Sequence, residues 1–219
     1  MLTRKLLAEA TGTAFLLMTI VGSGIMGDNL ANQQPGDTLL PHAIAIGAML
    51  FVLITLFGPV SGAHFNPAVT LVFALRRELP RSEALAYAAV QIAAGITGVI
   101  LAHLMFGADL LQGSVKPRSG IGQWVAEIIA TTGLILVILG GLRVRPDLIP
   151  ALVGLYIMAA LWFTASTSFA NPAVTIARMF TDSFSGILPT HAPAFIAAQL
   201  VGALGGWALA NAIWPGDSD

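Results

Sequence analysis

The sequence predicts an all-α membrane protein with six transmembrane helices, two re-entrant half helices and an inverted internal repeat. Three observations lead to this fold class. The 219 residues are 56% hydrophobic and only 10% charged, whereas a typical soluble domain is about 25% charged. Six apolar stretches approach the roughly 20 residues that a helix needs to cross a bilayer. The pentapeptide Asn-Pro-Ala-Val-Thr occurs twice, at residues 66–70 and 171–175.

The six apolar stretches are separated by polar or Gly- and Pro-rich segments, which are typical of loops. The predicted spans are Leu6–Met26, Leu40–Phe57, Ala84–Phe106, Ile121–Leu142, Leu148–Ala165 and Pro193–Trp214. The first span follows Arg4 and Lys5, but it is longer than a signal-peptide core and lacks a convincing cleavage site. We therefore interpret it as a membrane helix.

Each copy of the pentapeptide predicts the start of a short helix. Asn is a favoured N-cap, and Pro suits the first helical position because its missing N–H has no partner to lose there. Helices starting at Asn66 and Asn171 would run to about Arg76 and Phe180, which is too short to cross. The irregular backbone before them is tolerated at membrane depth only when it is buried in protein or lines a watery cavity.

Other matches recur at nearly the spacing of the two pentapeptides. Ala8-Glu9 corresponds to Ala126-Glu127, and Gln91 with Gly98 corresponds to Gln199 with Gly206. We expect a single domain, 1–219, made of two repeats at about 1–106 and about 120–219. Because each repeat holds three spans, an odd number, the second copy must enter the membrane from the opposite face.

The distribution of Lys and Arg predicts that both termini are cytoplasmic, in a multi-pass protein of the cell membrane. Short cytoplasmic loops carry an excess of these residues. With the N-terminus inside, the inner side receives Arg4, Lys5, Arg76, Arg77, Arg81, Arg143 and Arg145. The outer side receives Lys116, Arg118 and Arg178.

The inverted symmetry would bring the two half-helix N-termini head to head near the middle of the membrane. Their aligned N–H dipoles place positive partial charge there, and the amides of Asn66 and Asn171 offer N–H donors. Such a site would bind the oxygen of a neutral solute and repel cations, including protons.

The run from Ser61 to Thr70, Ser-Gly-Ala-His-Phe-Asn-Pro-Ala-Val-Thr, resembles the first signature loop of the major intrinsic protein family, the aquaporins and aquaglyceroporins. The similarity covers the whole chain. The resemblance implies a homotetramer in the lipid bilayer, with one pore per subunit. It also assigns roles to specific residues. The paired pore motifs would be Asn66, Pro67, Ala68, Asn171, Pro172 and Ala173.

The resemblance further implies that buried Glu9 and Glu127 hold backbone groups of the re-entrant loops, and that His64 is the family's loop histidine. An unperturbed histidine titrates near neutrality, so His64 could gate the pore with pH. We expect instead that it is a hydrogen-bonded loop anchor.

The sequence departs from the family at the outer selectivity filter. Three residues after the second Asn, the position of the family's filter arginine is Val174. The filter position of the second helix falls at Ile46 and that of the loop at Ser168, while the fifth-helix position lies among residues 159–161. These residues indicate a wider pore with an apolar wall, without the fork of donors that a guanidinium supplies.

One arginine lies close to this filter. Arg178 follows Val174 by four residues, one helical turn away on the same face. Its guanidinium could lean back toward the filter, since helical side chains tilt toward the N-terminus. We expect instead that it lies at the helix C-terminus and faces outside water.

The expected function is a passive channel for water, glycerol-like polyols or neutral metalloid acids such as arsenite, excluding ions and protons. In lacking the filter arginine, the sequence resembles some bacterial aquaglyceroporins that pass arsenic compounds. The alternatives are an ordinary water-selective aquaporin and a secondary transporter, which also uses inverted repeats.

With no Cys and four scattered His, we expect no enzyme activity, no cofactor and no metal site. The balanced charge argues against nucleic-acid binding.

Overall fold

The computed structural model describes residues 1–30 and 35–215, and these residues form helices and no strands. The α-helices are α1 Leu2–Leu30, α2 Pro35–Ser61, α3 Pro67–Leu75, α4 Arg81–Phe106, α5 Ile121–Val144, α6 Ile149–Phe163, α7 Pro172–Ala177 and α8 Ala192–Ile213. Three 3-10 turns adjoin them: η1 Pro146–Leu148, η2 Arg178–Phe180 and η3 Pro189–His191. Within this part of the chain, six helical segments are long and apolar enough to span a membrane. The predicted fold class is confirmed.

The helices differ from the predicted spans mainly at their ends. Helix α1 continues beyond the apolar run in both directions, to Leu2 and Leu30, because a helix persists into the polar headgroup region where long side chains can reach water. The fifth span was predicted at Leu148–Ala165, but it begins with η1 at Pro146 and its helix ends at Phe163. Half helix α7 is α-helical only to Ala177, and η2 completes it to Phe180.

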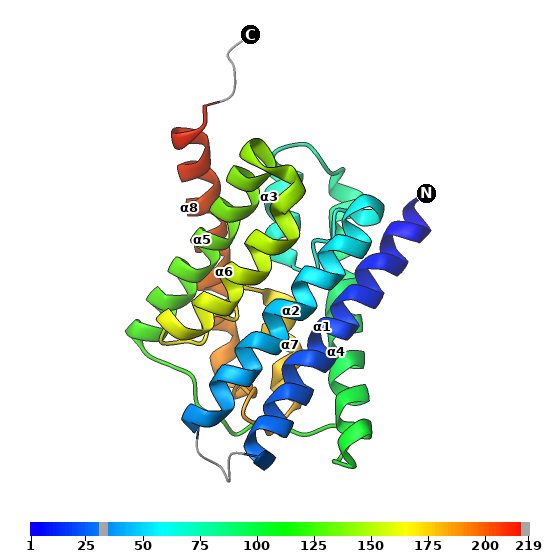
Figure 1. Cartoon of the computed structure of the whole chain (residues 1–219), viewed down its shortest axis with the longest axis vertical. Coiled ribbons are helices and arrows are strands. Elements are labelled where there is room, and N and C mark those ends of the chain that lie inside the picture. The colour runs from blue at the N-terminus through cyan, green and yellow to red at the C-terminus, as the bar shows by residue number, and fades with distance from the viewer. Residues whose placement is uncertain (31–34, 216–219) are drawn as a thin grey trace.

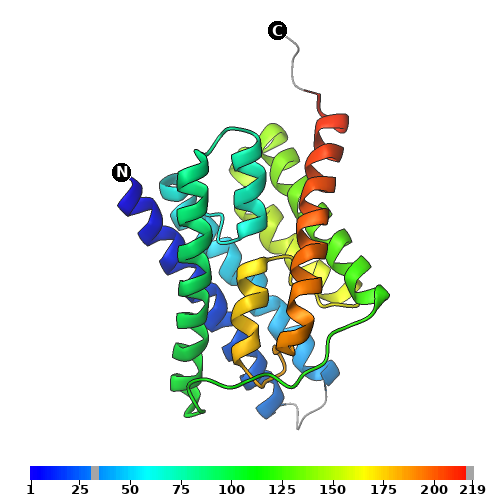
Figure 2. The same cartoon turned by 180° about the vertical axis from the view of Figure 1, so that it is seen from behind.

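The long helices extend from one end of the molecule toward the other, tilted relative to one another, and α1 begins at the same end at which α8 ends (Figures 1 and 2). Helix α1 packs on α2 and α4, and α5 packs in the same way on α6 and α8. Contacts between α2 and α6 join the two halves. The two sets of helices therefore repeat one packing pattern.

Two glycines at corresponding positions allow close contacts between these helices. A Cβ atom on Gly98 of α4 would meet the carbonyl oxygen of Ala14 on α1. A Cβ on Gly206 of α8 would meet the carbonyl oxygen of Thr132 on α5 in the same manner. Small residues let helix backbones approach this closely inside a membrane.

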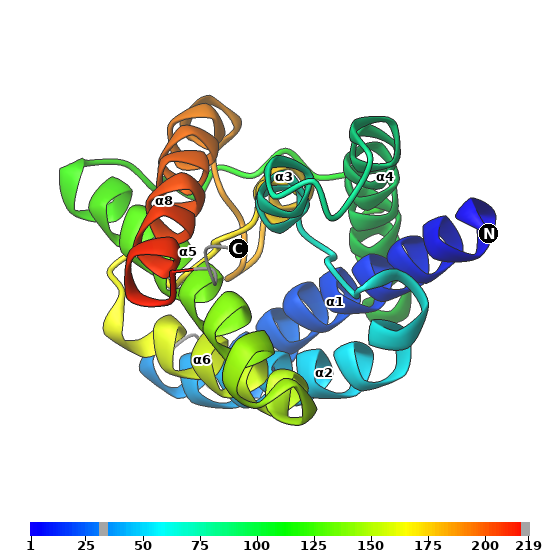
Figure 3. The same ribbon diagram turned by 90° about the horizontal axis from the view of Figure 1, so that it is seen from above.

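Half helices α3 and α7 lie in line with each other between α4 and α8 (Figure 2). Seen from above, α3 lies over α7, so the two share one axis (Figure 3). Each half helix contacts both α4 and α8. Together they fill a space that neither repeat encloses alone.

Candidate functional site

The two asparagines cap the half helices as the sequence predicted. Asn66 is extended, with φ −154° and ψ 117°, and its Oδ1 accepts a hydrogen bond from the Ala68 N–H at 2.9 Å. Asn171 has nearly the same conformation, and its Oδ1 accepts from the N–H groups of Ala173 at 2.9 Å and Val174 at 3.3 Å. A proline occupies the first turn of each helix.

The same asparagines tie the two loops to each other. Nδ2 of Asn66 donates to the carbonyl oxygen of Ala170, and Nδ2 of Asn171 donates to that of Phe65, both at 2.8 Å. Each amide has a second N–H, for which residues 1–30 and 35–215 supply no acceptor. These reciprocal bonds fix both amides at one point and leave a donor on each.

The loops before the asparagines adopt left-handed backbone conformations. Phe65 and Ala170, which directly precede the two Asn residues, have φ of 49° and 48°. Ala63 and Ser168, two residues earlier, have φ of 50° and 46°. This conformation costs about 1–3 kcal/mol for each residue other than glycine, so the surrounding contacts must hold these residues in place.

Glu9 of α1 holds the first loop. Its Oε1 accepts from the Ser61 hydroxyl at 2.7 Å and the His64 N–H at 3.0 Å. Its Oε2 accepts from the Phe65 N–H at 2.7 Å and from Gln91 Nε2 at 2.8 Å. The carboxyl group is fully buried and has four donors around it, which satisfies a buried polar group.

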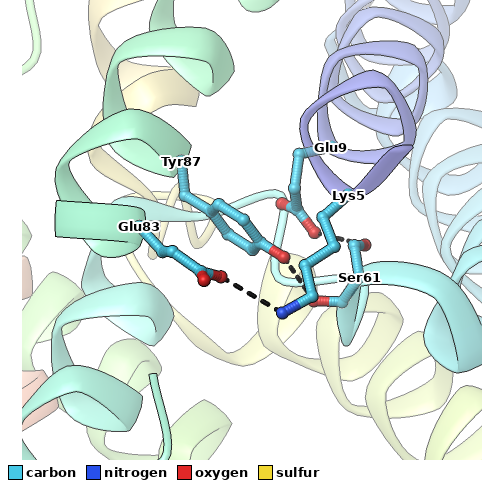
Figure 4. A network of polar contacts seen from close by, with 5 residues as sticks. All are labelled: Lys5, Glu9, Ser61, Glu83 and Tyr87. Atoms are coloured by element: carbon cyan, nitrogen blue, oxygen red, sulfur yellow. Dashed lines mark hydrogen bonds and ion pairs between the residues drawn. The ribbon is translucent and has the colours of Figure 1, made fainter. Parts of the chain in front are cut away.

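The network around Glu9 continues to the end of the bundle where α1 begins (Figure 4). The Tyr87 hydroxyl donates to the Ser61 carbonyl oxygen at 3.0 Å. Beyond it, Lys5 Nζ pairs with Glu83 Oε2 at 3.1 Å. These contacts join α1 and α4 to the start of the first re-entrant loop.

Glu127 of α5 holds the second loop in the same way. Its two carboxylate oxygens accept from the Phe169 and Ala170 N–H groups, each at 2.9 Å. Gln199 Nε2 donates to the same carboxylate at 2.6 Å, as Gln91 does to Glu9. The Glu127 side chain is also fully buried.

A cavity of about 460 Å³ is lined by both asparagines. Along α2 it extends from Ile46 to Pro59, a length of about 20 Å at the usual helical rise. The filter positions predicted from the sequence, Ile46, Ser168 and Val174, all line it. Among residues 159–161, Leu161 lines the cavity.

Sequence reasoning missed most of the cavity wall. Aliphatic side chains at helical i, i+4 spacing line it on four spans: Leu16 and Ile20, Ile46, Leu50 and Ile54, Leu134 and Ile138, and Val153, Ile157 and Leu161. The spacing itself is visible in the sequence. It does not identify the wall, because a membrane helix is apolar on its lipid-facing sides as well.

His64 makes the contacts of a loop anchor. Its Nδ1 lies 3.1 Å from the Thr70 hydroxyl, and its ring centroid lies 4.6 Å from that of Phe73. The residue also lines the cavity, so a pH gate stays a hypothesis.

Arg178 lies at the C-terminus of α7 as expected, but the expectation that it faces outside water was wrong. The residue is 3% exposed rather than facing outside water, and it lines the cavity. Its Nε donates to the Ser185 carbonyl oxygen. The reason is that the chain folds back after η2, with the Ile187 N–H donating to the Arg178 carbonyl oxygen at 3.2 Å. This returning segment covers the end of the half helix.

Arg118, in the loop between α4 and α5, was missed as well. It is 6% exposed, and its guanidinium donates to four acceptors at 2.8–3.3 Å: the carbonyl oxygens of Gly186, Ser166 and Phe184, and the Thr167 hydroxyl. Burial lowers the pKa of Arg118 to about 10, so the group stays charged at neutral pH. Nothing in the sequence distinguished it from an exposed loop arginine.

The comparisons with known proteins agree with this geometry. The family model described as major intrinsic protein matches residues 1–165. The aquaglyceroporin AqpS of Rhizobium meliloti (strain 1021) is 53% identical over 203 residues, covering 93% of this chain and 87% of that protein. The chain belongs to the major intrinsic protein family.

Two further proteins extend the comparison. Nodulin-26 of Glycine max is 36% identical over 63% of this chain, and the match spans 50% of its length. The X-ray structure of the aquaglyceroporin from Plasmodium falciparum aligns with a TM-score of 0.76 at 21% identity, covering 98% of both chains. At that identity the alignment shows the shared fold.

Proposed function

We propose that this member of the major intrinsic protein family is a passive channel for water, glycerol-like polyols or neutral metalloid acids such as arsenite. The observation that carries the proposal is the cavity, which passes two amide groups with free N–H donors and is otherwise bounded largely by aliphatic side chains. Two relatives described as aquaglyceroporins support it. The chain is not an enzyme.

The paired Asn-Pro-Ala segments contribute to the exclusion of ions and protons. Asn66 and Asn171 each keep one N–H for an oxygen in the cavity. The N-termini of α3 and α7 begin beside them, and helix N-termini carry positive partial charge. A neutral oxygen is stabilised at such a site, whereas a cation is repelled.

Ile46, Ser168 and Val174 set the preference among neutral solutes. Ile46 and Val174 contribute apolar surface, and the Ser168 hydroxyl is buried without a protein partner in the described residues. A wall of this kind offers few replacements for the water that a solute loses on entry. Larger, weakly polar neutral solutes therefore gain relative to water.

The test is stopped-flow uptake by proteoliposomes for water, glycerol, urea and arsenite, with Val174→Arg beside the wild type. The added guanidinium narrows the cavity, so we expect glycerol and arsenite uptake to fall about tenfold, or about 1.4 kcal/mol of barrier, and water uptake to fall less. Val115→Arg adds the same side chain at an exposed loop position and should change nothing.

Each other outcome points to a defined alternative. If Val174→Arg matches the wild type for every solute, the filter assignment is wrong. If arsenite or boric acid enters no faster than into empty vesicles, neutral metalloid acids are not substrates of the channel. A wild type that passes only water is a water-selective aquaporin, and saturable, gradient-driven accumulation indicates a secondary transporter.

We also propose that the channel is a homotetramer in the cell membrane, with one pore per subunit. Membership of the family supports this assembly. Sedimentation of the detergent-solubilised protein, corrected for bound detergent, should give four times the chain mass of 22.7 kDa. A mass of one chain would contradict it.

A further inference from the structure

The Ile46 end of the cavity contains a buried arginine one turn beyond the filter position that lacks one. Arg178 and Val174 both line the cavity, and both are 3% exposed. They lie four residues apart, at the spacing that places two helical side chains on one face. The cavity therefore has a guanidinium group in its wall although residue 174 is valine.

Two of the three nitrogens of this guanidinium, Nη1 and Nη2, have no hydrogen-bond partner among the described residues. Its Nε donates to Ser185, but residues 1–30 and 35–215 supply neither a hydrogen-bond acceptor nor an ion pair for Nη1 or Nη2. Neither nitrogen is fully enclosed. Burying a charged group without partners is costly, so these N–H groups require an acceptor among the molecules that occupy the cavity.

Arg118 provides the contrast. Every nitrogen of its guanidinium donates to a protein oxygen, and the residue does not line the cavity. Its bonds join the α4–α5 loop to the second re-entrant loop, at Ser166 and Thr167. Arg118 is therefore a positioning residue, while Arg178 keeps unused donors.

Phe169 fixes the direction of the free guanidinium. The Cζ of Arg178 lies 3.4 Å from the centroid of the Phe169 ring, and that of Arg118 lies 4.9 Å from it. The ring is held edge-to-face against Phe195, with centroids 5.2 Å apart. Stacking on an aromatic face stabilises a guanidinium and leaves its N–H groups pointing outward from the edge.

On the basis of the channel function proposed above, we propose that Arg178 supplies the cationic donor group of the selectivity filter, in place of residue 174. Its Nη1 and Nη2 groups donate hydrogen bonds to neutral solutes with two neighbouring hydroxyl groups. A planar pair of donors matches two adjacent oxygens better than it matches one water molecule. The same charge repels cations before they reach Asn66 and Asn171.

This arrangement also accounts for a small residue at position 174. An arginine there would lie one turn from Arg178 on the same face, and like charges at that spacing repel. Valine leaves the space beside the guanidinium open to the solute. The shift of the charge by one turn thus favours a small, uncharged side chain at 174.

The natural chain has no cysteine, which permits a test in which one folded variant gains or lacks the charge. In Arg178→Cys, a methanethiosulfonate that attaches an aminoethylthio group through a disulfide, with release of methanesulfinate, restores a cation, whereas one that attaches a methylthio group does not. We expect the unmodified variant to lose the preference for glycerol over water about tenfold and to leak protons. The aminoethylthio group should restore both properties, and the methylthio group neither. Unchanged selectivity before modification, or equal effects of the two reagents, would overturn the proposal.

A second variant leaves Arg178 in place and does not depend on transport. The thiol of Val174→Cys should react faster with an anionic methanethiosulfonate than with a cationic one, because the guanidinium focuses positive potential in the cavity. We expect this preference to be about tenfold larger than that of Thr190→Cys at the exposed surface. Equal ratios at the two positions contradict the role of Arg178. Failure of the wild type to pass any solute faster than empty vesicles would instead contradict the channel function.

Discussion

At the scale of single residues, two buried glutamates hold a strained backbone in place. Glu9 and Glu127 accept the N–H groups of the loop residues that precede each asparagine. Two of these residues, Phe65 and Ala170, have positive φ, a conformation that persists only when the surrounding contacts hold it in place. The carboxylates hold the loop backbone in this conformation because both oxygens of each accept hydrogen bonds.

Glu127→Gln should therefore destabilise the protein. The amide keeps one oxygen acceptor but turns an NH₂ group toward a backbone N–H of Phe169 or Ala170, so that buried donor loses its partner. We expect a loss of about 2–4 kcal/mol in the free energy of unfolding, measured by thermal unfolding in detergent, together with reduced glycerol flux.

Glu78→Gln is the matched control. Glu78 pairs with Arg76 at the surface, with 43% of its side chain exposed, and exposed ion pairs contribute little. Equal unfolding temperatures for the two variants would show that the buried carboxylate is not needed to hold the loop.

At the scale of the elements, close packing of the long helices depends on glycine. Gly98 and Gly206 lie where a Cβ would enter the backbone of the neighbouring helix. Neither glycine lines the cavity, so their role lies in the packing of the helices around it.

Gly98→Ala should separate α1 from α4. The added methyl group meets the Ala14 carbonyl oxygen, which belongs to the backbone and cannot rotate away, so we expect a loss of about 1–3 kcal/mol. Gly122→Ala, in α5, places the same methyl group in open space and should be neutral or stabilising by up to about 1 kcal/mol. Thermal unfolding of both variants measures the difference, and similar losses would refute the packing argument.

At the scale of the whole molecule, the start of α1 and the end of α8 lie on the same side of the helix bundle (Figures 1 and 2). The excess of Lys and Arg on that side favours the cytoplasm. Arg118 and Arg178 belong to the opposite side, but both are buried, so neither is a free loop charge. The charge asymmetry of the exposed surface is therefore greater than the sequence count indicates.

The chain has only two lysines, Lys5 and Lys116, which makes the orientation testable. Lys116 donates to the Phe184 carbonyl oxygen at 2.7 Å. Partial burial, with the nearby charges of Arg118 and Arg178, lowers the pKa of Lys116 to about 8. Its neutral, reactive form therefore increases as the pH rises through 8.

A membrane-impermeant acylating reagent added outside intact cells should modify Lys116 and leave Lys5 unmodified. We expect the rate of labelling to rise most steeply near pH 8, as mass spectrometry of the labelled peptide would show, and Lys116→Arg should abolish it. External labelling of Lys5 would reverse the predicted orientation.

The sequence alone determined the fold class, the six spans and the caps of the two half helices, because each depends on local chemistry: hydropathy over about 20 residues, and an Asn-Pro pair at a helix start. The repeated pentapeptide also indicated that Asn66 and Asn171 belong together. Their side chains do bond to each other's loops.

Only the tertiary structure decided which apolar residues line the cavity and where the arginines lie. Leu16 or Ile20 look like any lipid-facing residue, since a membrane span carries no polar face to mark its exposed side. Arg178 was expected in water, but the segment after η2 folds back over it, and Arg118 reaches its four acceptors from a different loop. Their burial results from contacts between segments far apart in the chain, which no local pattern encodes.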